Sequence, residues 1–221
     1  MAIPAGALPD AIDGSGLRGP IAAARFAVID VETSGLRPSR HRLLQIGVVR
    51  ALGDGTVLDR WDTLLRAPWR PMGGRAIHGL SRRTLRGAPR LREVAEELSR
   101  RLEGSILCAH NAEFDWVFLA RGLRRAGAPP PDALRLCTLR LSRSLDVERT
   151  RSHRLADLCQ RYEVSLTRAH DAAADAAATA DLLPHLLQEA GITELPQLLP
   201  HLAGSTTSWN SGGGLREATQ R

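Results

Sequence analysis

Two carboxylates interrupt an apolar, β-branched segment near the start of the chain. The segment 26-FAVIDVETSGL-36 carries Asp30 and Glu32, two residues apart. Side chains alternate across a strand, so both acids would point to one face and repel each other unless a positive charge lay between them. Magnesium and manganese are hard cations that prefer oxygen ligands, and either would remove this cost. The alternative is that the strand ends at Ile29 and both acids are solvated loop residues.

A third carboxylate lies on a predicted helix. In 109-AHNAEFDWVFLA-120, Asn111 follows a short apolar strand and is a candidate N-cap. Asp115 shares a helical face with Phe118 and Leu119, and an acid on an apolar stripe is costly to bury unless it is paired. The helix dipole also favours a negative charge at this end of a helix, so it offers a structural reason for Asp115.

The segment 168-RAHDAAADAAATADLL-183 combines a histidine with two more acids. His170 and Asp175 are five residues apart, about 140° around a helix, so they cannot share a helical face. We therefore place His170 in the loop before the helix, Asp171 at the N-cap and Asp175 in the first turn. Asp171 and Asp175 do share a face, so Asp171 is a rival ligand. A single histidine in a loop is otherwise an ordinary surface residue.

These three segments need a scaffold, and the hydrophobic pattern predicts one. Strands are expected at 26–31, 43–52, 56–65 and 105–109, with 53-GDG-55 turning a hairpin and a short apolar stretch at 134–139. Helices are expected at 91–102, about 111–126, near 155–162 and 171–190, with a loop over 66–81. Strands in a meander followed by strands alternating with helices predict a mixed α/β sheet covered by helices.

Composition sets the wider limits. All 30 basic residues are arginine and the net charge is +6, which points weakly to a polyanionic partner such as nucleic acid, although an arginine-rich proteome explains it equally well. The scattered Cys108, Cys137 and Cys159 are expected to be reduced core residues. The chain has no apolar run long enough for a membrane span and no signal-peptide pattern, so we expect a cytoplasmic protein.

The ends of the chain differ from its middle. Residues 1–20 are rich in Gly, Pro and Ala without periodicity and are expected to form a disordered leader. Residues 204–221 are expected to form a flexible tail, which leaves 21–203 as one folded domain.

Taken together, the three segments resemble the DEDDh family of 3′–5′ exonucleases, whose members include the proofreading epsilon subunit of bacterial DNA polymerase III. The matching residues are V-I-D-V-E-T-S-G, A-H-N-A-E-F-D and H-D-A-A-A-D, and the last fits the family's H-x-A-x-x-D through His170, Ala172 and Asp175. A sister subfamily has a tyrosine where this chain has Asp171. Further similarity lies in 77-IHGLS-81 and 153-HRLADLCQRYEV-164, and Ser34 replaces a common threonine.

The resemblance implies an RNase H-like fold, a mixed five-stranded sheet with the first three strands antiparallel and helices on both faces. It also implies that two Mg²⁺ ions, for which Mn²⁺ would substitute, are held by Asp30, Glu32, Asp115 and Asp175. His170 would be the general base. Residues along the terminal nucleotide would be Thr33, Ser34, His78, Asn111 and Phe114, although core packing is an ordinary role for Phe114.

The implied reaction is removal of nucleoside 5′-monophosphates from the single-stranded 3′ end of DNA, in proofreading or repair. An RNA-trimming exoribonuclease fits the same residues, because no motif encodes contact with the 2′-hydroxyl. A catalytically silent nucleic-acid-binding or polymerase-scaffolding module is a further alternative. Partners would be a DNA polymerase subunit or a sliding clamp. The segment 197-QLLPHL-202 is faintly similar to a clamp-binding peptide, although a helix end explains it too.

Overall fold

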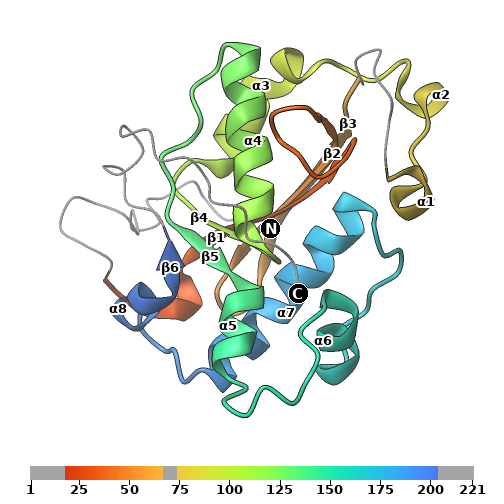
Figure 1. Ribbon diagram of the computed structural model, residues 1–221. Coiled ribbons are helices and arrows are strands. Elements are labelled where there is room, and N and C mark those ends of the chain that lie inside the picture. Colours follow the sequence, from red (N-terminus) through yellow and green to blue (C-terminus); the bar gives the residue numbers. More distant parts are fainter. Residues whose placement is uncertain (1–17, 67–73, 204–221) are drawn as a thin grey trace, which may run out of the picture.

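The computed structural model describes residues 18–66 and 74–203 (Figure 1). In these residues the strands form one mixed sheet in the order β3-β2-β1-β4-β5-β6. The first three, β1 (Arg25–Thr33), β2 (Leu43–Leu52) and β3 (Val57–Leu64), are antiparallel neighbours. The next two, β4 (Ile106–Ala109) and β5 (Arg135–Cys137), run parallel to β1. The predicted mixed sheet with three antiparallel strands is confirmed.

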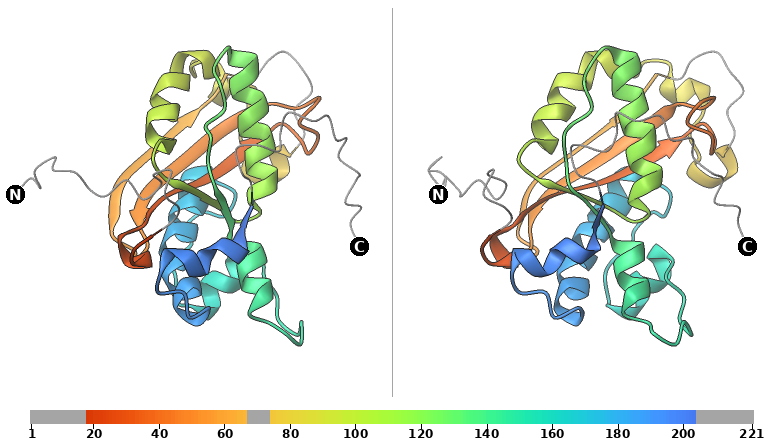
Figure 2. Two further views of the ribbon diagram at one scale, coloured as in Figure 1. Left: turned by 90° about the vertical axis from the view of Figure 1, so that its left-hand side faces the viewer. Right: turned by 60° about the vertical axis from the view of Figure 1, so that its left-hand side comes forward.

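Helices cover both faces of the sheet, as predicted (Figure 2). One apolar cluster lies under α3 (Leu91–Leu102) and α4 (Ala112–Ala126). A second cluster lies on the opposite face, under α5 (Thr138–Ser144), α6 (Leu155–Arg161), α7 (Ala172–Glu189) and α8 (Leu195–Leu198). The sheet is therefore the middle layer of three.

The central strand β1 contributes side chains to both clusters because its residues alternate. Ala27, Ile29 and Val31 lie in the cluster under α3 and α4. Phe26 and Val28 lie in the cluster under α7. Asp30 and Glu32 continue the row of Phe26 and Val28 by the same alternation, so they face the α7 side at the end of the strand.

Several elements differ from the sequence-based expectation. The sheet has a sixth strand, β6 (Leu202–Ala203), antiparallel to β5, which is too short to show a periodic pattern. The expected loop at 66–81 contains the one-turn helix α1 (Arg75–His78), and α2 (Arg82–Leu85) follows directly. The apolar stretch at 134–139 divides into β5 and the start of α5. Two 3₁₀ turns, η1 (Ile21–Ala23) and η2 (Leu199–His201), precede β1 and β6 along the chain.

Three further expectations concern composition and the chain ends. Cys108, Cys137 and Cys159 are buried free thiols, as expected. Among the described helices, none is long and apolar enough to cross a membrane. Most of the expected leader (1–17), the whole expected tail (204–221) and residues 67–73 lie outside the described residues.

Candidate active site

Strand β1 continues through both of its acids. It ends at Thr33, so Asp30 and Glu32 are strand residues, and the loop alternative considered for them is wrong. Asp30 lies opposite Gly47 of β2, and Glu32 lies opposite Gln45. Both side chains are partly buried. The end of β1 thus presents two carboxylates, on one face, to the start of α7.

Asp115 reaches the same strand end from α4. Pairing between β1 and β4 stops at Val28, so the amide of Val31 has no partner from β4. The Val31 amide instead donates to Oδ1 of Asp115 at 3.2 Å. Asp115 is buried, with 3% of its surface exposed. Asn111 is the N-cap of α4, as predicted, but it adopts a left-handed conformation (φ 83°) and its side chain makes no capping bond.

The start of α7 separates the roles of its two acids. Oδ1 of Asp171 accepts hydrogen bonds from the amides of Ala173 and Ala174 at 3.1 and 3.3 Å, so Asp171 caps the helix as predicted. Its Oδ2 lies 3.4 Å from the guanidinium of Arg168. Asp175 faces β1 instead. The capping contacts therefore weaken the case for Asp171 as a rival ligand.

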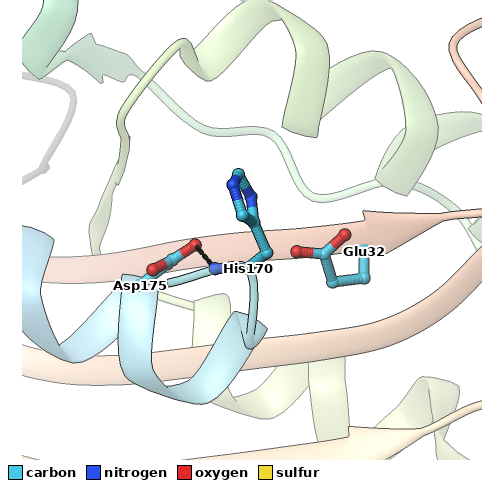
Figure 3. A group of neighbouring side chains, drawn as sticks. All are labelled: Glu32, His170 and Asp175. Carbon is cyan, nitrogen blue, oxygen red and sulfur yellow. Dashed lines mark hydrogen bonds between the residues drawn. The ribbon is translucent and has the colours of Figure 1, made fainter. Parts of the chain in front are cut away.

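His170 lies in the loop directly before that cap, as predicted. Its backbone has φ 64°, a left-handed conformation that is uncommon outside glycine. Its amide donates to Oδ2 of Asp175 at 3.0 Å. Potential ligand atoms of Glu32, His170 and Asp175 all lie within 4.8 Å of one another. Figure 3 shows the two carboxylates on either side of the exposed histidine, one from the strand and one from the helix.

Two residues that the sequence did not single out set this close approach. A Cβ atom on Gly47 would lie 2.2 Å from the carbonyl oxygen of Ala172, so α7 can rest on β2 only because residue 47 is glycine. The neighbouring Gln45 accepts a hydrogen bond from the amide of Ala172 at 3.3 Å. A glycine within a strand signals a close backbone approach, and this is the signal that could have identified Gly47.

All four acids have raised pKa values, and burial is the largest cause for each. Burial, followed by repulsion from Asp115 and Asp175, raises the pKa of Asp30 well above its usual range. Burial, followed by repulsion from Asp175, raises the pKa of Glu32 to about 7. Burial raises the pKa of Asp115 to about 8, although backbone hydrogen bonds oppose this shift. Burial also raises the pKa of Asp175. A group of carboxylates with this electrostatic cost requires protons or cations for balance.

A divalent cation fits this arrangement. Oδ1 of Asp175 is buried and has no hydrogen-bond partner in the part of the chain that the structure describes. A buried oxygen without a partner is costly, whereas a metal ion would satisfy it. The donors are carboxylate oxygens with one nearby imidazole, a set that suits Mg²⁺ or Mn²⁺ better than the softer metals that select thiolates.

A cavity of about 570 Å³ opens beside the acids. Asp30, Asp175 and His170 form one part of its lining. The same lining contains three arginines, Arg143, Arg151 and Arg154, and the imidazoles of His110 and His153. Guanidinium groups that share a cavity with a carboxylate cluster can bind a phosphate, whose charge the acids would otherwise repel.

Of the five residues expected to contact the substrate, one is among the described residues that line this cavity. Asn111 lines the 570 Å³ cavity. The hydroxyl of Thr33 donates to the carbonyl of Gly35, and the hydroxyl of Ser34 accepts from the amide of Arg42, so both side chains are engaged in the turn after β1.

The aromatic residues of this set lie away from the cavity. Phe114 packs against Phe118 with ring centroids 5.0 Å apart, which is the core role considered for it. Nδ1 of His78 accepts from the amide of Leu80 at 3.0 Å. A Cβ atom on Gly74 would lie 3.1 Å from Nε2 of His78 and 3.8 Å from the carbonyl of Thr33. His78 is therefore near the end of β1.

The family model RNase_T, described as an exonuclease, matches residues 27–183. The chain is 34% identical over 184 residues to the PolC-type DNA polymerase III of Lacticaseibacillus paracasei, an alignment that covers 80% of this chain and 12% of that protein. It is 31% identical over 173 residues to the PolC-type DNA polymerase III of Halalkalibacterium halodurans, covering 77% of this chain and 12% of that protein. The chain thus spans about an eighth of the length of these relatives.

Solved structures share the fold. E. coli exonuclease I in complex with a dT13 oligonucleotide matches with a TM-score of 0.69 and 20% identity, over 80% of this chain and 43% of that chain. Exonuclease X in complex with 5′ overhanging duplex DNA matches with a TM-score of 0.59 and 24% identity, over 76% of this chain and 93% of that chain. The predicted exonuclease fold is confirmed.

Proposed function

Because the chain belongs to the RNase T family of exonucleases, we propose that it is a metal-dependent 3′–5′ exonuclease that releases nucleoside 5′-monophosphates from DNA. The observation that carries this proposal is the acid cluster around the buried, unpaired Oδ1 of Asp175, set beside a cavity with a basic lining. This arrangement combines sites for cations with a site for a phosphate, which phosphodiester hydrolysis requires.

Each group in the site has a proposed task. Asp30, Glu32, Asp115 and Asp175 would hold two divalent ions, whose positive charge would stabilise the attacking and leaving oxygens of the phosphodiester. Arg143, Arg151 and Arg154, which line the same cavity, would bind the phosphate groups of the strand. Asn111, which lines the same cavity, would contact the terminal nucleotide.

His170 would be the general base. Its amide is held by Asp175, which fixes the backbone beside the acids. Its side chain is exposed, so the imidazole can turn towards the cavity and accept a proton from the attacking water. Asp171 would act only as a helix cap, because its Oδ1 is engaged by two backbone amides.

Comparison with known proteins supports DNA as the substrate. The curated relatives are PolC-type DNA polymerases, and two structures that share the fold were solved with DNA. We therefore propose a proofreading or repair role in the cytoplasm, with a DNA polymerase subunit as the partner. The alternative partner is a sliding clamp, and the alternative substrate is RNA. A comparison of activity on DNA and RNA of the same sequence separates the two substrates.

The proposal can be tested with 5′-labelled single-stranded DNA and RNA of matched sequence, incubated with Mg²⁺, Mn²⁺ or EDTA. We expect a metal-dependent ladder that shortens from the 3′ end, faster on DNA, and absent for Asp30→Ala. The matched control is Asp181→Ala, which removes an exposed acid from α7 and should retain full activity. Faster shortening of RNA would assign an exoribonuclease. No shortening of either strand, with binding retained, would favour the catalytically silent module.

A further inference from the structure

A second cavity, of about 690 Å³, lies on the opposite face of the sheet from the acid cluster. It is enclosed by the first residue of β2, the residues after β3, and parts of α2, α3 and α4. Its apolar lining includes Leu43, Leu65, Leu85 and Phe118, each no more than 5% exposed. The bottom of this cavity is therefore continuous with the core under α3 and α4.

The remaining lining is strongly basic. Seven of the fifteen described lining residues are arginines, and none of the fifteen is acidic. Within the described part of the chain, no carboxylate forms an ion pair with Arg42, Arg66, Arg86, Arg90 or Arg125. Like charges gathered in this way repel one another, and an anionic ligand would relieve that repulsion.

We propose that this cavity binds an acidic peptide segment of a partner protein, anchored by a bulky apolar side chain. The apolar floor would bury the anchor, because an apolar side chain in a desolvated pocket contributes most of the affinity in such interfaces. The arginines would pair with carboxylates on both sides of the anchor, and their planar guanidinium groups suit that geometry. This site is separate from the proposed exonuclease site and does not depend on it.

The side chains that line the cavity favour a peptide over a nucleic-acid strand. Single strands are held by exposed aromatic rings on which bases stack, beside a basic groove. Among the described lining residues Phe118 is the one phenylalanine, tyrosine or tryptophan, and only 2% of it is exposed, so none of these large rings is presented for stacking. A nucleic-acid strand would use the arginines but would leave the apolar floor without a partner.

The test uses the full-length chain and a fluorescein-labelled pentapeptide with one tryptophan between two pairs of aspartates. Fluorescence anisotropy is measured for the wild type and for Arg86→Glu/Arg90→Glu, which reverses two exposed charges at the cavity. The control Arg60→Glu/Arg124→Glu makes the same change in net charge at exposed arginines outside the lining. Two further peptides replace the tryptophan with alanine, or the aspartates with asparagine.

We expect saturable binding that weakens about tenfold in Arg86→Glu/Arg90→Glu and changes less than twofold in the control. Both replacement peptides should bind more weakly, since each lacks one half of the proposed recognition. Equal loss in both charge variants, or equal binding of the alanine peptide, would overturn the proposal by showing that only net charge matters.

Exonuclease kinetics on a single-stranded oligonucleotide identify the alternative occupant. If the cavity takes a peptide, Arg86→Glu/Arg90→Glu should leave KM for the oligonucleotide within twofold of the control variant. A rise in KM in this variant alone, together with absent peptide binding, would assign the cavity to nucleic acid and refute the peptide. If the wild-type protein has no exonuclease activity, the proposed function is refuted, but the peptide measurement is unaffected.

Discussion

The substitution Gly47→Ala should displace the helix that carries the histidine and the last acid of the proposed site. A Cβ atom on Gly47 would lie 2.2 Å from the carbonyl oxygen of Ala172 and 2.8 Å from the amide of Ala173, both backbone atoms. Ordinary contacts begin at 3.4 Å, so the start of α7 must move by about 1.2 Å, the difference from 2.2 Å. It would move away from β1, carrying Asp175 away from Glu32.

Two quantities should change as a result. A misplacement of about 1 Å in a catalytic arrangement lowers the rate by about 100-fold. Overpacking of this kind costs about 1–3 kcal/mol of stability. For a chain of this length that corresponds to a Tm lower by about 2–12 °C. The assays are kcat on a 5′-labelled oligonucleotide and thermal unfolding with and without Mg²⁺.

The matched control is Gly87→Ala, because a Cβ atom on Gly87 has no heavy atom within 4 Å and its φ is negative. Gly87→Ala should leave both kcat and Tm close to their wild-type values. If Gly47→Ala and Gly87→Ala behave alike in both assays, α7 does not rest on β2 as described, and the reasoning fails.

Three further predictions concern the acids and the histidine. Asp175→Asn should abolish activity and reduce the Mg²⁺-induced rise in Tm. Asp171→Ala should lower the free energy of unfolding by about 1 kcal/mol, because a helix cap is lost, and should retain the Mg²⁺-induced rise in Tm. The same Mg²⁺ response in both variants would return Asp171 to the ligand set. The raised pKa values mean that the carboxyl groups bind protons more tightly in the folded chain than in the unfolded chain. Protonation of these groups therefore stabilises the fold fully below about pH 4, and this stabilisation is lost as the pH rises. In EDTA, Tm should therefore fall as the pH rises through about 7 and 8, the pKa values of Glu32 and Asp115, and Mg²⁺ should reverse the fall. A Tm in EDTA that rises over this range would contradict the raised pKa values of these acids. His170→Ala should lower kcat by at least about 100-fold and leave the Mg²⁺-induced rise in Tm unchanged; loss of that rise would make His170 a ligand rather than a base.

The sequence correctly predicts the elements that have a long periodic pattern or a clear cap. The helical stripe at 91–102 and the capping pattern before α7 correspond to the observed helices, because burial of one face and satisfaction of the first amides are local requirements. Placing Asp175, rather than Asp171, towards the strand needed the family resemblance, because both share one helical face. The structure adds the physical reason, since the Asp171 carboxylate is engaged by the amides of its own helix.

What sequence reasoning missed depends on contacts between distant segments. The role of Gly47 rests on Ala172, and Gln45 is engaged by the same residue, more than 120 positions away. Helix α1 and strand β6 are too short for any period to be visible. The arginine-lined cavity is assembled from separate turns and helices, so the sequence shows only a general excess of arginine.

Two of the acids in the proposed site are held by main-chain groups rather than by other side chains. The Val31 amide holds Asp115, and the His170 amide holds Asp175. Every amino acid except proline supplies such an amide. A change of side chain at position 31 that preserves the buried packing of Val31 therefore keeps the anchor of Asp115, and at position 170 a change of the base leaves the anchor of Asp175 in place. Proline lacks the amide, but it would also disturb the backbone, because its φ of about −65° differs from the φ of 64° at His170 and because position 31 lies inside the central strand β1.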